Sequence, residues 1–63
     1  MDNLHSEFER LRADAYRVKK VKSLRFIEKL GWKEVQKNNH SKESLKEFKA
    51  LRKLIKKRIA LLS

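Results

Sequence analysis

The sequence predicts an all-α protein, a small bundle of three helices formed by residues 4–18, 23–36 and 42–62. The chain has no Pro and one Gly, and the good helix formers Leu, Lys, Glu, Arg and Ala are abundant. Apolar residues recur at helical spacing, and no run shows the alternation typical of a strand. With 63 residues the chain forms a single domain. A helical hairpin that dimerises into a four-helix bundle is the alternative.

The first helix has a narrow apolar stripe. Its members are Leu4, Phe8, Leu11, Ala15 and Val18. At about 100° per residue, spacings of three and four keep them on one face. Ser6 followed by Glu9 matches a capping box at the start of the helix, and Asp2 or Asn3 could cap it instead.

The apolar stripe does not continue, because its next positions hold Lys22 and Arg25. The later apolar residues define a rotated face: Leu24, Ile27, Leu30 and Val35. Either the helix breaks near residues 19–23, with Ser23 capping a second helix, or one long helix over residues 4–31 presents two faces. We favour the break.

Gly31 accepts a positive φ, so it could end the second helix, with Trp32 folding back as a hydrophobic contact. A helix that continues to about Lys37 is the alternative. The segment 38–41, Asn-Asn-His-Ser, is the clearest loop of the chain.

The last helix is strongly amphipathic. Its apolar side holds Leu45, Phe48, Leu51, Leu54, Ile55, Ile59 and Leu62, and its other side holds Lys46, Lys49, Lys53, Lys56 and Lys57. This division requires a core on one face and water or a polyanion on the other. Ser41 or Ser44 caps the helix, and Ser44 with Glu47 fits a capping box. Arg58 intrudes on the apolar side, where it snorkels or forms an ion pair.

The aromatic residues are expected to pack more than to bind. Phe8, Phe26 and Phe48 occupy apolar faces and are assigned to the core, whereas Tyr16 lies off the first stripe. Trp32 stands among lysines and could stack on a nucleic-acid base, but we expect it to close the core.

Positive charge is concentrated after the first helix. The net charge is +10, from 18 Lys and Arg against 8 Asp and Glu. Residues 1–16 carry four acids and two bases, a net of −2, and residues 17–63 carry sixteen bases and four acids, a net of +12. The first cationic cluster comprises Arg17, Lys19, Lys20, Lys22 and Arg25. The second comprises Lys46, Lys49, Arg52, Lys53, Lys56 and Lys57.

These clusters predict contacts with the phosphate backbone of nucleic acid, with DNA favoured over RNA, because Lys and Arg displace condensed counterions. The dipole of the last helix favours some of the cations near its C-terminus, which is a structural reason for part of the second cluster.

Other classes of function lack the residues they need. Without Cys there is no disulfide scaffold or thiol nucleophile, and two His cannot supply the four ligands of a zinc finger. Neither a Gly-rich phosphate loop nor an oxyanion loop is present. His5 and Glu9 are interpreted as a surface pair. We therefore expect no enzyme, no metal and no cofactor.

The longest uncharged run, residues 59–63, is far shorter than the roughly 20 residues that span a bilayer. The acidic beginning of the chain does not resemble a signal peptide. We expect a cytoplasmic protein that does not enter a membrane.

The sequence thus favours a small basic DNA-binding regulatory or accessory factor. The alternative is a helical adaptor or inhibitor that binds a protein partner through an exposed apolar groove. About 60 residues bury only a marginal core, and the net charge of +10 adds self-repulsion. We therefore expect a homodimer, or a bound polyanion that neutralises the charge.

Overall fold

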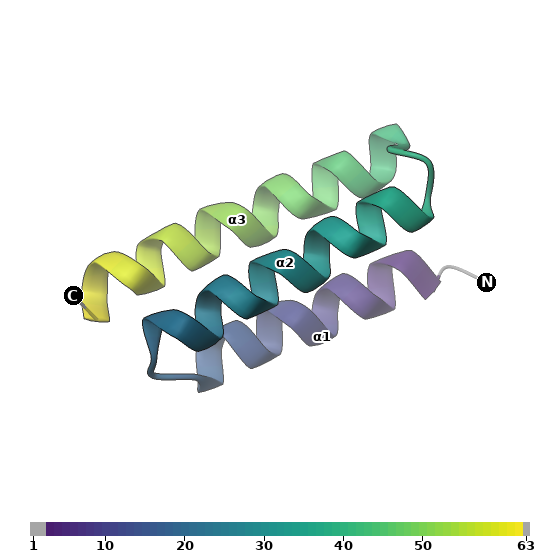
Figure 1. The fold of residues 1–63 in the computed structure, drawn as a ribbon. Helices are drawn as coiled ribbons and strands as arrows, with labels where there is room; N and C mark the ends of the chain where they lie inside the picture. Colours follow the sequence, from purple (N-terminus) through teal and green to yellow (C-terminus); the bar gives the residue numbers. More distant parts are fainter. Residues whose placement is uncertain (1–2, 63) are drawn as a thin grey trace.

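Three helices pack side by side in the computed structural model, which describes residues 3–62 (Figure 1). They are α1 (Asn3–Arg17), α2 (Val21–Lys37) and α3 (Lys42–Leu62). Short connections make consecutive helices antiparallel, and each helix contacts the other two in a bundle of 35 × 17 × 15 Å. The three-helix prediction is confirmed, and each predicted boundary lies within two residues of the observed one.

The helix breaks between α1 and α2, as favoured from the sequence. Residues 18–20 are not helical, and Lys20 is extended, with φ −118° and ψ 134°. The alternatives of one helix over residues 4–31 and of a two-helix hairpin are therefore wrong. Ser23 does not cap α2, because Lys20 occupies the cap position and makes no side-chain cap hydrogen bond. The break allows the apolar faces of both helices to meet one core.

The start of α1 differs from the predicted capping box. Because α1 already includes Asn3, Ser6 and Glu9 lie inside the helix. Asp2 and the side chain of Asn3, the alternative caps, lie outside the described part of the chain.

Ser41 caps α3. Its Oγ accepts a hydrogen bond from the Ser44 backbone N–H at 3.2 Å, and the Ser44 hydroxyl donates to the Ser41 carbonyl at 2.8 Å. Ser44 is thus a buried residue of the first turn, and the predicted box of Ser44 with Glu47 is wrong. Glu47 has partners on α1 instead.

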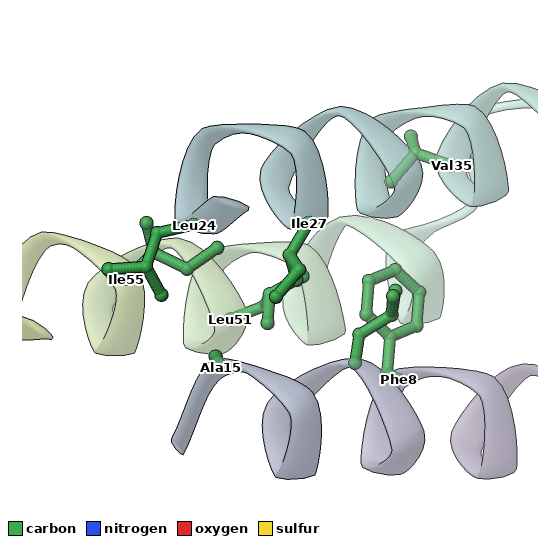
Figure 2. Close-up of a cluster of buried hydrophobic side chains, with 8 residues drawn as sticks. Phe8, Ala15, Leu24, Ile27, Val35, Leu51 and Ile55 are labelled. Carbon is green, nitrogen blue, oxygen red and sulfur yellow. The ribbon is translucent and has the colours of Figure 1, made fainter. Parts of the chain in front are cut away.

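Eight buried apolar side chains form the core. They are Phe8, Leu11 and Ala15 of α1, Leu24, Ile27 and Val35 of α2, and Leu51 and Ile55 of α3. Figure 2 shows these helices turning the labelled side chains toward a common interior. Partly buried residues extend this core: Leu4, Val18, Leu30, Phe48, Leu54 and Ile59. The predicted stripes are confirmed except at the edges of α3, where Leu45 and Leu62 stay 38% and 36% exposed.

Phe26 is not a core residue, contrary to the prediction, because its side chain is 60% exposed. It follows Leu24 by two positions and is therefore rotated by about 200° from that buried residue. Phe8 is fully buried, and Phe48 packs against the core, as predicted.

Gly31 does not end α2. The helix continues to Lys37, which was the alternative, and Gly31 has no positive φ. The positive φ values, 55° each, belong to Asn39 and His40 in the predicted loop. Gly31 is buried against Leu51 and Phe48 of α3, so its missing side chain serves packing and not a turn.

Arg58 of α3 forms hydrogen bonds with the C-terminal end of α1. Its Nε donates to the Ala15 carbonyl at 3.3 Å, and its Nη2 donates to the carbonyls of Tyr16 at 3.2 Å and Val18 at 3.1 Å. These carbonyls lie at the C-terminal end of α1, where helical partners are missing. Arg58 thus neither snorkels nor forms the expected ion pair within the described residues. Its side chain, from α3, caps the C-terminal end of α1.

Glu47, in the second turn of α3, also contacts α1. It accepts a hydrogen bond from Arg12 Nη1 at 2.9 Å and lies 3.3 Å from His5 Nδ1. Burial raises the pKa of Glu47, but the hydrogen bonds and charges of Arg12 and His5 outweigh this and lower it below its ordinary value of 4.5. His5 also lies 3.7 Å from Glu9, as the predicted surface pair requires.

Candidate nucleic-acid interface

A groove with a volume of about 840 Å³ lies between α2 and α3. Both helices contribute to its walls. Its lining residues are Lys22, Arg25, Phe26, Glu28, Lys29 and Trp32 of α2 with Phe48, Arg52, Lys56 and Ile59 of α3. Five of these side chains are cationic, and Glu28 is the one acid among the described lining residues. We call this hollow the α2–α3 groove.

The groove brings part of the two predicted clusters together. Lys22 and Arg25 come from the first cluster, and Arg52 and Lys56 come from the second, about thirty residues later in the chain. The sequence predicts the clusters but not their meeting. Antiparallel packing of α2 on α3 produces it, because the start of α2 then lies beside the end of α3 (Figure 1).

The other cluster residues surround the groove without lining it. Arg17, Lys19 and Lys20 lie at the connection between α1 and α2, next to the end of α3 that carries Arg58. The outward side of α3 holds the rest: Lys46, Lys49, Lys53 and Lys57. All eleven predicted residues are exposed, so positive charge extends beyond the groove on two sides.

Glu28 and Arg52 face each other across the groove. Glu28 Oε2 lies 3.8 Å from Arg52 Nε, and both side chains are partly exposed. Within residues 3–62, Arg52 is the one member of the two clusters that forms an ion pair. The other ten cations have no carboxylate of the described residues to neutralise them.

The helix dipole accounts for Arg17 in the last turn of α1, but not for the cations of α2 and α3. The first turn of α2 has no acidic residue, and Lys20 and Lys22 stand at its start, where the positive dipole end disfavours cations. The last turn of α3 has no basic residue, although a dipole acts mainly within that turn. The dipole reason suggested for the second cluster therefore fails.

Aromatic side chains form part of the groove surface. The ring of Trp32 lies 5.3 Å from that of Phe48 and 5.5 Å from that of His40, measured between centroids. Trp32 remains 40% exposed, so it closes the core only in part. Phe26, at 60% exposed, lies on the outer edge of the same groove.

Lys29 and Phe26 line the groove but are not among the site residues predicted from the sequence. Arg25, Lys29 and Trp32 are separated by four and three positions, which places them on one side of a helix. That spacing could have identified a cationic and aromatic edge. The apolar pattern by itself indicates only the face of α2 that packs into the core.

The acidic side chains of the described residues gather mostly on the other side of the bundle. Glu47 holds Arg12, Glu7 lies 3.9 Å from Arg10, and Glu34 of α2 borders a smaller groove against α1. No group of three or more His, Asp or Glu within residues 3–62 is placed to hold a metal ion.

No helix in residues 3–62 combines the length and the apolar character that crossing a bilayer demands.

No protein-family model, no curated protein and no solved structure matches this chain.

Proposed function

We propose that this protein binds nucleic acid through the α2–α3 groove and the cations beside it, as a small accessory or regulatory factor that acts on DNA. The observation that supports this most is the convergence of Lys22 and Arg25 with Arg52 and Lys56 on one groove. Two segments far apart in sequence place positive charge on one surface. Among the described lining residues, Glu28 is the one carboxylate that opposes this charge.

The mechanism is release of counterions. Lys and Arg near the phosphates replace condensed cations, which favours binding at low salt irrespective of base sequence. Binding also relieves the repulsion among the cations that form no ion pair within residues 3–62. Such contacts position a protein on nucleic acid without reading its sequence.

The test is the salt dependence of binding to a labelled 20-base-pair duplex, followed by fluorescence anisotropy. We expect log K to fall linearly with log salt, at about 0.9 for each phosphate contacted, with several contacts. A flat titration, or no binding at low salt, would contradict the proposal.

A matched pair of variants tests the surface. Arg25→Glu with Lys56→Glu reverses two groove cations, whereas Arg10→Glu with Lys33→Glu reverses two exposed cations outside the groove. Each pair of substitutions lowers the net charge of the protein by the same amount, so the comparison tests where on the surface the charge is reversed. We expect the groove variant to lose at least about tenfold more affinity than its control. Equal losses would show that net charge alone drives binding.

A protein partner is the second candidate, because the groove also exposes Phe26 and Trp32. An acidic amphipathic helix would suit such a surface. The ratio of absorbance at 260 and 280 nm, measured on protein purified without nuclease, separates the two: co-purified nucleic acid raises it. Binding to nucleic acid at low salt would argue against this second candidate.

The homodimer expected from chain length stays a prediction. Sedimentation at micromolar concentration checks it, and a single 7.6 kDa species would contradict it.

A further inference from the structure

Phe26 and Trp32 expose aromatic surface beside cations, an arrangement that phosphate contacts alone do not require. Phe26 is 60% exposed and Trp32 is 40% exposed, although the bundle has a core that other apolar residues fill. Lys29 lies three positions before Trp32, and residues at that spacing are neighbours on a helix surface. Both aromatic residues line the α2–α3 groove together with Lys29.

We infer that the α2–α3 groove takes single-stranded nucleic acid, with bases stacked on Trp32 and Phe26 and phosphates on the surrounding cations. This inference rests on the proposed function and specifies its substrate. Proteins that bind single strands combine a positive groove along the backbone with aromatic side chains on which bases stack. The α2–α3 groove holds both components.

The position of the aromatic rings favours a single strand over a duplex. In a duplex each base is stacked between its neighbours, so its flat surface is covered. The base must be extruded from the duplex, at a cost in free energy, before an aromatic ring can stack on it. The bases of a single strand are exposed and can enter the groove directly. The volume of the α2–α3 groove, about 840 Å³, lies within the range of about 300–1,000 Å³ found for ligand sites.

The ring of Trp32 is held by contacts with two other rings. Phe48 packs against it at an interplanar angle of 58°, and His40 meets it in a T-shaped contact at 67°. These two contacts fix the ring while leaving part of it exposed. A ring that is held before binding loses little conformational entropy when a base stacks on it.

The extent of positive charge favours a polyanion over a single partner helix. Cations continue beyond the groove, at Lys19 and Lys20 on one side and at Lys49 and Lys53 on another. A helix seated in the groove would leave these residues without contacts, whereas a flexible chain of phosphates can follow them.

Trp32 is the one Trp of the chain, so its fluorescence reports on the groove directly. The protein is titrated with a 20-nucleotide thymidine oligomer and with a 20-base-pair duplex at low salt. Binding is measured in parallel by anisotropy of the labelled nucleic acid. We expect the single strand to quench Trp32 to saturation and the duplex to bind with little quenching, because only the single strand can stack on the indole.

A matched pair of aromatic variants accompanies the titration. Phe26→Leu removes an exposed ring that lines the groove, and Tyr16→Leu removes one that is 65% exposed on α1 outside it. We expect Phe26→Leu to weaken single-strand binding at least about fivefold and Tyr16→Leu to leave it unchanged. Circular dichroism checks that both variants keep the helical content of the original protein.

The outcomes separate the two proposals. If single strand and duplex bind equally without quenching, and Phe26→Leu behaves like Tyr16→Leu, the stacking inference is wrong and phosphate binding stands. If neither nucleic acid binds at low salt, both proposals are wrong, and an acidic protein partner becomes the better occupant of the groove.

Discussion

Gly31 of α2 and Leu51 of α3 lie so close together that a Cβ on Gly31 would come within 2.7 Å of Leu51 Cδ2. The same Cβ would lie 3.2 Å from Phe48 Cδ1. Leu51 is fully buried, and protein interiors are close-packed, so moving its side chain aside would disturb its neighbours. The glycine therefore sets the distance between the two helices that form the groove.

Replacing Gly31 with Ala should destabilise the protein. Helix propensity alone would favour Ala by about 1 kcal/mol, but overpacking in a filled core costs about 1–3 kcal/mol. We expect a net loss in the free energy of unfolding, measured by urea denaturation followed by circular dichroism. Ala13→Gly, at an exposed position of α1, measures the propensity effect separately. A higher denaturation midpoint for Gly31→Ala would show that α3 moves aside without cost.

Arg58→Ala should destabilise the bundle by about 1–3 kcal/mol, because a charged donor is lost from three carbonyls at the end of α1. Lys57→Ala is the matched control, since it removes the same charge from an exposed neighbour within α3. Urea denaturation should show a clear loss for the first variant and little change for the second. Equal midpoints for the two variants would contradict the capping role of Arg58.

Glu47 should make stability depend on pH. Its pKa in the folded protein lies below the ordinary value of 4.5, so the folded state favours the charged carboxylate. This contribution is present above about pH 4.5 and disappears as the pH falls through the lowered pKa. Glu47→Gln should cost about 1 kcal/mol at pH 7, and the difference from the original protein should shrink below about pH 4.5. Chemical denaturation at pH 7 and pH 3 measures both values, and a constant difference would oppose this role.

Asn39 should tolerate Gly but not Val. Its φ of 55° is left-handed, a conformation that costs an ordinary residue about 1–2 kcal/mol and Gly much less. Asn39→Val should therefore lower the thermal midpoint, and Asn39→Gly should change it little. If Val is tolerated, the turn has adopted another backbone conformation, which the chemical shifts of the loop would reveal.

The fold could be predicted from spacing because each core face repeats at helical intervals. The stripe from Phe8 to Ala15 and the stripe from Leu51 to Ile55 are confirmed for this reason. Spacing does not report how closely two helices approach, so the sequence alone leaves open whether Gly31 ends α2 or lies within it, and does not reveal its contact with α3. It also does not distinguish a serine that caps a helix from one inside the first turn, as Ser44 shows.

The candidate site was predictable in composition but not in arrangement. Charge counting identifies Lys22 and Lys56 as cluster members, but only the packing of α2 against α3 places both on one groove. The prediction that Phe26 occupies an apolar face is wrong, because its angular position relative to Leu24 favours exposure. The contacts of Arg58 with α1 join residues about forty positions apart, and no local pattern records them.

Bases outnumber acids on α2 and α3, whereas α1 carries as many acids as bases, and this difference gives the molecule an asymmetric electric field. Residues 1–16 sum to −2 and residues 17–63 to +12. Near any polyanion such a molecule experiences a torque that turns the first helix outward before contact. Collisions would then begin in a productive orientation, and the gain in encounter rate would fade once dissolved ions shorten the reach of that field to about 10 Å.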